Sequence, residues 1–137
     1  MPPPSSPPPG PAPRGPLHAL GTIILYVTQM ARSVAFYRDA LGLPVRLESP
    51  EWVELGTGGA TLALHAGVHP APPGSPKAGS VPHVQVSFGV ASVAAAHAAL
   101  VARGVTFLHG PRPIAPGISL ARFDDPDGHA LSISGPA

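Results

Sequence analysis

The chain has 137 residues, of which 44% are hydrophobic and only 11% charged, and its formal net charge is +1. This length gives room for one domain with one core. The absence of cysteine excludes a disulfide framework and a cysteine-based zinc site, and no run of lysine or arginine predicts a nucleic-acid partner. No stretch approaches the roughly 20 apolar residues of a membrane span. We therefore expect a cytoplasmic protein with no membrane partner.

The chain begins with a stretch dominated by proline. The first sixteen residues contain nine prolines, and proline removes backbone donors and fixes φ. We therefore predict that residues 1–20 form a disordered proline-rich tail. A second stretch rich in proline and glycine, residues 67–82, predicts a linker between a first module, residues 21–66, and a second module, residues 83–137. The two modules are expected to make one domain over residues 21–137.

The first module begins with an alternating strand at Thr22–Val27, followed by a helix that Gly42 ends. Three short strands are predicted after it, at Pro44–Glu48, Trp52–Gly56 and Ala60–Ala66. In each strand, large aliphatic side chains alternate with smaller or polar ones. One face of this sheet is therefore expected to pack on the helix.

The second module repeats this order. Residues 84–100 (VQVSFGVASVAAAHAAL) are a weak echo of residues 21–37 (GTIILYVTQMARSVAFY). Ser92 is the predicted N-cap of the second helix, and strands are expected at 84–90, 105–108, 118–123 and 130–134. This repeated order of one strand, one helix and three strands predicts an α+β fold of two similar halves that face each other across a cleft.

The faces that point away from the predicted helices carry small and polar side chains. Such faces either are open to water or line a cavity between the two sheets, and we favour the cavity. The candidate ligand-binding residues are Thr22, Tyr26, Trp52, Glu54, His65, Gln85, Ser87, Phe123 and Ser132.

These candidates have competing interpretations. Trp52 offers a flat apolar wall for a planar ligand or simply packs at a sheet edge. Glu54 pairs with a ligand amine or with Arg46 across the hairpin. His65 lines the pocket as a neutral hydrogen-bonding group or acts as a general base. Phe123 is expected to close the cleft.

The residues around the last predicted turn are assigned structural roles. Asp125 and Asp127 belong to an Asp-Pro-Asp-Gly sequence and are expected to form a turn, not to serve as catalytic carboxylates. Arg122 and His129 are expected at the surface.

Four sequence phrases carry a resemblance to a known family. LYVTQMARSVAFYRDALGL, WVELGTGGATLALH, ALVARGVTF and FDDPDGHALSI, in this order, resemble the vicinal oxygen chelate superfamily, which includes glyoxalase I, extradiol dioxygenases and the fosfomycin- and bleomycin-resistance proteins. The resemblance implies two βαβββ modules whose curved mixed sheets surround a cleft, with helices on the outer faces. It also implies a homodimer, and the cleft forms either within one chain or across two.

The resemblance bears directly on metal binding. It places the four metal-ligand positions of the family at Thr22, Ala63, Gln85 and Ser132, and only glutamine among these is a usual ligand. Since a divalent metal needs about three good donors, we expect no metal cofactor. The alternative is a displaced divalent-metal site, for which the candidate donors are His65, His83, Gln85 and Glu54.

Two functions follow as hypotheses. The first is a metal-independent small-molecule-binding protein of the glyoxalase/bleomycin-resistance type, which holds a small, partly aromatic or amphipathic ligand in the cleft. The alternative is a divalent-metal-dependent lyase or dioxygenase that uses the displaced donors. A cofactor-free isomerase or an accessory domain is a third possibility, so whether the chain is an enzyme stays open.

Overall fold

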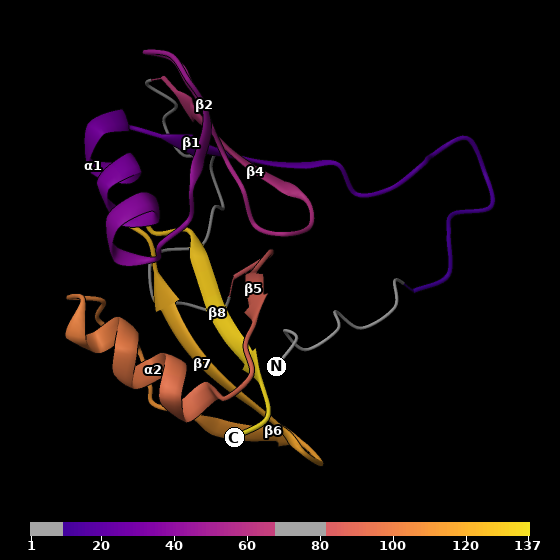
Figure 1. The fold of residues 1–137 in the computed structure, drawn as a ribbon, viewed down its shortest axis with the longest axis vertical. Coiled ribbons are helices and arrows are strands. Elements are labelled where there is room, and N and C mark those ends of the chain that lie inside the picture. The colour runs from indigo at the N-terminus through magenta and orange to yellow at the C-terminus, as the bar shows by residue number, and fades with distance from the viewer. Residues whose placement is uncertain (1–9, 68–81) are drawn as a thin grey trace, which may run out of the picture.

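The computed structural model describes residues 10–67 and 82–137. Most of the predicted linker, with His69, and the first half of the predicted tail lie outside these residues. Within the described part of the tail, residues 10–21 form neither helix nor strand, and Figure 1 shows this segment running away from both sheets.

The first module forms one mixed sheet covered by a helix. Its elements are β1 (Thr22–Val27), α1 (Met30–Val34), the π-helix η1 (Ala35–Ala40), β2 (Val45–Glu48), β3 (Trp52–Leu55) and β4 (Thr61–Ala66). The strand order is β1-β4-β3-β2, with β1 parallel to β4 and the other pairs antiparallel. Gly42, at φ +81°, follows the helix in the left-handed conformation that the sequence predicted.

The second module repeats this topology. Its elements are β5 (Val86–Gly89), α2 (Val93–Ala102), β6 (Arg112–Ala115), β7 (Ile118–Asp124) and β8 (Ala130–Gly135), in the order β5-β8-β7-β6. Ser92 caps α2, because its side chain accepts a hydrogen bond from the Ala95 backbone N–H. The α+β fold of two βαβββ modules is thus confirmed. Each helix covers one face of its own sheet, and the two sheets do not join (Figure 1).

The two modules share one hydrophobic core. Alternating residues of β1, β4 and β8 face their helices, so that Leu64 and Leu131 are fully buried. Phe36 of η1 reaches across to Phe123 of β7, with ring centroids 6.3 Å apart. Phe123, which was expected to close the cleft, is fully buried and lies opposite Leu131 in the β7–β8 pairing, on the helix side of the sheet.

Two other expectations differ from the structure. The strand expected at 105–108 is reduced to a single bridge between Phe107 and Phe123, and the edge strand is instead β6, whose four residues are all exposed. The strand expected to begin at Val84 begins at Val86, and Val84 is 75% exposed. Val105 and Phe107 still pack against the core although they form no strand, whereas Val84 does not.

The Asp-Pro-Asp-Gly turn joins the two modules. Asp125 accepts hydrogen bonds from the backbone N–H groups of Asp127 (2.9 Å) and His129 (2.8 Å), as a turn-forming residue should. Its other oxygen accepts from the Tyr37 hydroxyl of η1, at 2.7 Å. This turn is therefore both a local structure and a buried polar contact between modules.

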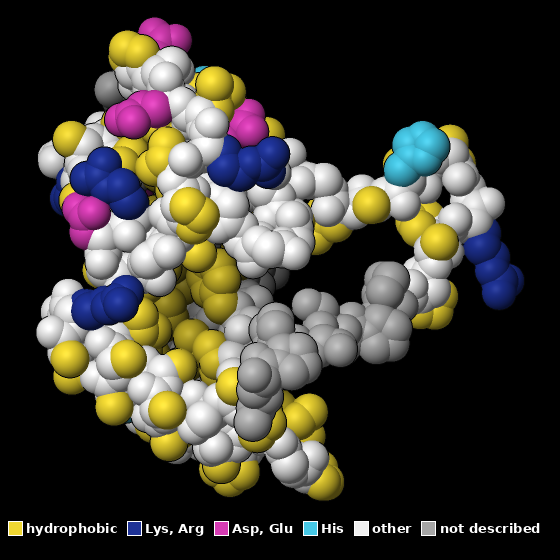
Figure 2. Space-filling view, in the orientation of Figure 1, with side chains coloured by type: hydrophobic (Ala, Val, Ile, Leu, Met, Phe, Trp, Pro, Cys, Tyr) yellow, Lys and Arg dark blue, Asp and Glu magenta, His cyan; other side chains and the backbone are white. Residues whose placement is uncertain are grey.

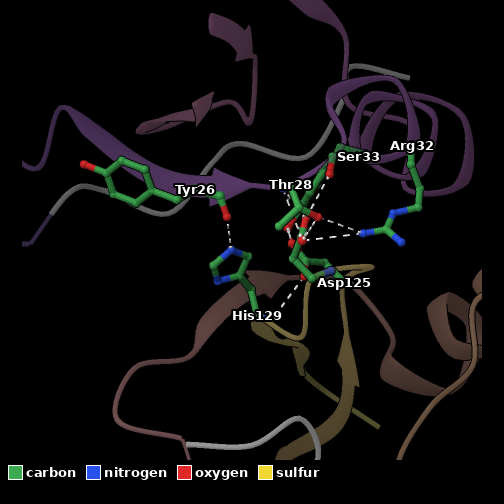
Figure 3. A network of polar contacts seen from close by, with 8 residues as sticks. Tyr26, Thr28, Arg32, Ser33, Asp125 and His129 are labelled. Atoms are coloured by element: carbon green, nitrogen blue, oxygen red, sulfur yellow. Dashed lines mark hydrogen bonds and ion pairs between the residues drawn. The ribbon is translucent and has the colours of Figure 1, made fainter. Parts of the chain in front are cut away.

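Neighbouring residues of this turn extend the contact (Figure 3). The Asp127 carboxylate accepts from the Thr28 hydroxyl at 2.6 Å and lies 3.5 Å from the Arg32 guanidinium. His129 Nε2 lies 2.8 Å from the Tyr26 carbonyl oxygen and donates to it, because a carbonyl can only accept. His129 is thus half-buried and bonded to the other module, where the sequence suggested a surface residue.

The Tyr37–Asp125 pair gives the stability of the fold an alkaline limit. Burial, followed by the charge of Asp125 and its hydrogen bond, raises the pKa of Tyr37 well above its ordinary value. Above about pH 10 the unfolded chain loses this proton while the folded chain keeps it, so Tyr37 lowers the free energy of unfolding by up to about 1.4 kcal/mol per pH unit. We expect Tyr37→Phe, though less stable at pH 8, to lose less stability than the wild type between pH 10 and 11. Urea unfolding at each pH measures this, and parallel losses would contradict it.

Candidate functional site

The face of the first sheet that points away from α1 carries a row of three rings. Tyr26 of β1 pairs with His65 of β4, and His65 pairs with Trp52 of β3, so the three side chains stand side by side across three strands. The ring centroids of Tyr26 and His65 are 5.4 Å apart, and those of His65 and Trp52 are 5.8 Å apart. Tyr26 is 49% exposed. We call Tyr26, His65 and Trp52 the aromatic row.

A carboxylate lies beside the aromatic row. Glu54 accepts a hydrogen bond from the Trp52 indole N–H at 2.9 Å, and no ion pair joins it to any of the described residues. Arg46, the alternative partner, instead donates to the Thr61 hydroxyl at 3.3 Å. Only one of the two Glu54 oxygens is held by the indole. The other is available to a donor above the sheet.

The next position along the strands is apolar. Ile24, 44% exposed, pairs with Ala63 of β4, and Ala63 pairs with Glu54 of β3. Thr22 lies further along β1 on the same face and is exposed. The face therefore offers a largely apolar, ring-lined surface with one carboxylate at its edge, which suits an aromatic ligand that carries a hydrogen-bond donor or a positive charge.

The corresponding face of the second sheet is polar. Ser87 of β5 pairs with Ser132 of β8, and Ser132 pairs with Arg122 of β7. The Ser87 and Ser134 hydroxyls are 2.8 Å apart. Ser132 is fully buried, and Arg122, expected at the surface, is mostly covered and lies 3.3 Å from the Asp124 carboxylate. This face therefore carries hydroxyls and an ion-paired arginine, where the first sheet carries rings.

The structure separates the predicted site residues into two groups. Thr22, Tyr26, Trp52, Glu54 and His65 share the face of the first sheet that points away from α1. Of the others, Ser87 and Ser132 share the equivalent face of the second sheet, the exposed Gln85 precedes β5, and Phe123 lies in the core.

The donor set does not fit a metal ion. The positions to which the resemblance assigns metal ligands hold a threonine, an alanine, a serine and the exposed Gln85. The displaced donors do not converge either: His65 and Glu54 belong to the first sheet, and His83 precedes β5 in the second module. Within residues 10–67 and 82–137, no group of three or more His, Asp or Glu side chains could hold a metal.

Two features of these faces were missed from the sequence. Leu47 pairs with Glu54 and so shares its face, because β2 has a bulge between Val45 and Leu47, and no sequence signal marks this bulge. Arg122 alternates with Ala121 and Phe123, so the strand period predicts that it points to the opposite face, and the β7–β8 pairing places it beside Ser132. What the period could not reveal is that this face is covered at that point.

Comparison with known proteins identifies the family. The model of the Glyoxalase/Bleomycin resistance protein/Dioxygenase superfamily matches residues 18–133. The chain therefore belongs to this superfamily, as the resemblance of its sequence phrases implied. Among the curated proteins, none matches the sequence.

Solved structures share the fold. A glyoxalase/dioxygenase from Nostoc punctiforme is 22% identical with a TM-score of 0.72, over 91% of this chain and 95% of that chain. Lactoylglutathione lyase from Agrobacterium tumefaciens is 23% identical with a TM-score of 0.68, over 88% of this chain and 95% of that chain. A glyoxalase/bleomycin resistance protein/dioxygenase from Nocardioides is 22% identical with a TM-score of 0.68, over 85% of this chain and 82% of that chain.

In the described residues, no helix has the length and apolar character needed to cross a membrane.

Proposed function

We propose that the protein binds a small aromatic molecule carrying an amine, without a metal, on the face of the first sheet that points away from α1. The observation that carries this proposal is the aromatic row with Glu54 at its edge. Three rings stand side by side across three strands, with neighbouring ring planes inclined at 56° and 62°, and together they line an apolar surface. The Glu54 oxygen that does not bond the indole supports binding of a cationic or hydrogen-bond-donating group.

The donor set favours binding without a metal over the lyase or dioxygenase alternative. A catalytic metal site in this type of protein needs about three nitrogen or oxygen ligands from side chains that converge. The positions available here are occupied by Thr22, Ala63 and Ser132, with Gln85 the sole usual ligand. No step of a metal-assisted reaction is therefore assigned to these residues.

Tryptamine and 2-naphthol test this proposal as a pair of probes. Both carry a bicyclic aromatic ring, but only tryptamine is a cation at pH 7. We expect Trp52→Ala to weaken the binding of both probes about tenfold or more, since an aromatic wall contributes on the order of 1–2 kcal/mol. Glu54→Gln should weaken tryptamine several-fold and leave 2-naphthol nearly unchanged. Calorimetric titration measures each dissociation constant.

Leu108→Ala is the matched control, because Leu108 is an exposed apolar residue, 47% accessible, in the other module. It should bind both probes as the wild type does. Equal losses in Leu108→Ala and Trp52→Ala, or no binding of either probe by the wild type, would contradict the proposal.

The exposed side chains of this face also bear on assembly. Ile24, Tyr26 and Leu47 are 44–54% exposed and lie on the same sheet. An apolar face of this kind supports the proposal that the protein is a homodimer, in which a second copy covers part of the ligand surface. Sedimentation equilibrium tests this, and a monomer at micromolar concentration would contradict it.

We retain a cytoplasmic location as part of the proposal.

A further inference from the structure

A hollow lies between the modules, on the helix side of the second sheet. It has a volume of about 360 Å³. Its floor is Phe88, Phe123 and Ile133, one wall is α2, and Leu41 and Leu43 of the first module form the other. Figure 2 shows a hollow between the two halves whose interior is hydrophobic. We call it the α2 pocket. It is separate from the aromatic row, which faces away from the helices.

The internal repeat shows why this space is empty in one module and filled in the other. Aligning residues 21–37 with residues 84–100 places Ala99 where the first module has Phe36, and Leu100 where it has Tyr37. In the first module these two rings are packed edge to face, 5.2 Å apart, and Tyr37 is fully buried. In the second module the smaller side chains leave the equivalent volume open.

The turn before the last strand of each module also fills space in one module and leaves it open in the other. In the second module, Asp125 and Asp127 of the turn between β7 and β8 reach η1 and α1 and fill the junction there. The equivalent turn of the first module, residues 56–60, is rich in glycine and contributes only Thr57 to the α2 pocket. The pocket therefore results from differences between the two modules in helix side-chain size and in turn composition.

One cation stands at the α2 pocket. Arg103, at the C-terminal end of α2, is among its lining residues, and its guanidinium lies 3.1 Å from the point where a Cβ on Gly42 would be. Arg103 thus spans the gap between the modules. It forms no ion pair with any acidic residue in the described parts of the chain. An apolar cavity with a single unneutralised guanidinium is complementary to an anion with an apolar body.

We propose that the α2 pocket is a second ligand site, which binds a monoanionic amphiphile such as a medium-chain carboxylate. The hydrocarbon part lies against α2, Phe88 and Phe123, and the carboxylate lies at Arg103. The volume is at the lower end of the range for small-molecule sites, which suits a chain of about ten carbons. This site does not depend on the function proposed for the aromatic row.

Decanoate and decanol are the probes, measured by calorimetric titration of the full chain. We expect decanoate to bind more tightly than decanol. Ala99→Phe, which restores the ring found in the first module, should weaken decanoate about tenfold or more by filling the cavity. Ala98→Phe is its control, because Ala98 is an exposed neighbour on α2 that does not line the pocket. If Ala99→Phe fails to fold, Ala99→Leu makes the same test with a smaller side chain.

The charge is tested separately. Arg103→Gln should weaken decanoate about fivefold and leave decanol within twofold, because only the carboxylate uses the guanidinium. Arg112→Gln removes an exposed charge elsewhere and should change neither. Trp52→Ala should bind decanoate as the wild type does, and Ala99→Phe should still bind tryptamine, so the two sites can fail independently. No binding of decanoate, equal binding of decanol, or equal losses in Ala98→Phe and Ala99→Phe would overturn the proposal.

Discussion

Replacing Asp125 by alanine is expected to lower the free energy of unfolding by about 2–4 kcal/mol. The carboxylate is 5% exposed and accepts hydrogen bonds from the Tyr37 hydroxyl and from two backbone N–H groups of its own turn. Alanine removes the acceptor of all three hydrogen bonds and leaves the Tyr37 hydroxyl buried without its partner. At about 4 °C per kcal/mol, the melting temperature should fall by roughly 10 °C or more.

Asp39→Ala is the matched control for this loss. Asp39 is likewise an aspartate with a bonded carboxylate, in a salt bridge 2.8 Å from Arg38, but both of these side chains are exposed. Its removal should cost less than about 0.5 kcal/mol. A free energy of unfolding for Asp125→Ala within that same margin of the wild type would show that the turn does not hold the two modules together.

Gly135→Ala is expected to destabilise the protein by about 2–4 kcal/mol. Gly135 ends β8 at φ +154°, a conformation that L side chains rarely adopt. A Cβ there would lie 2.2 Å from the Val90 carbonyl oxygen, which is backbone and has no alternative rotamer. That backbone is itself fixed, since the Val90 N–H donates to the Ser134 carbonyl at 3.0 Å. Either β8 or the end of β5 must therefore shift.

Gly89→Ala provides the comparison within the same strand pair. Gly89 pairs with Ser134, has no heavy atom within 4 Å of its added Cβ, and does not have a positive φ. This substitution should change the free energy of unfolding by less than about 1 kcal/mol. Chemical denaturation of both variants measures the difference. Equal stabilities would mean that the close approach at Val90 costs nothing.

The sequence predicts most of the fold because its strands alternate clearly. Leu62 and Leu64 identify the buried face of β4, and this places His65 on the opposite face with no further information. The glycine after each helix and the serine before α2 mark helix ends for stereochemical reasons that are local. Such signals depend only on neighbouring residues, so they can be interpreted without a structure.

The sequence predictions fail where tertiary contacts determine which residues form a strand and which face is buried. β6 contains Pro113 and is exposed throughout, so no apolar pattern distinguishes it from a loop. Phe123 alternates correctly with Arg122, but the period leaves open which face is buried, and the pairing of Phe123 with Leu131 across the turn decides it. The π-helical turn at Ala35–Ala40 has no marker in the sequence.

The candidate site was predicted in part. Placing Trp52, Glu54 and His65 on one face followed from strand alternation, and the structure aligns them with Tyr26 in adjacent strands. The partner of Glu54 was left open between a ligand amine and Arg46. In the structure, Arg46 donates a hydrogen bond to the Thr61 hydroxyl. Glu54 instead accepts from the indole N–H of Trp52, two residues earlier in the same strand, a contact that no strand-pairing rule predicts.

Fluorescence of Trp52 tests the central claim most directly, because it is the only tryptophan of the chain and belongs to the proposed site. The protein is treated with EDTA, divided, and titrated with phenethylamine, an aromatic amine that does not absorb at the red edge of tryptophan excitation, with and without one equivalent of Zn²⁺, Ni²⁺, Mn²⁺ or Fe²⁺. Metal-independent binding predicts a saturable change in emission with the same dissociation constant in every sample. A change that occurs only after one metal ion binds stoichiometrically would contradict the account and would make His65 and Gln85 the first residues to replace.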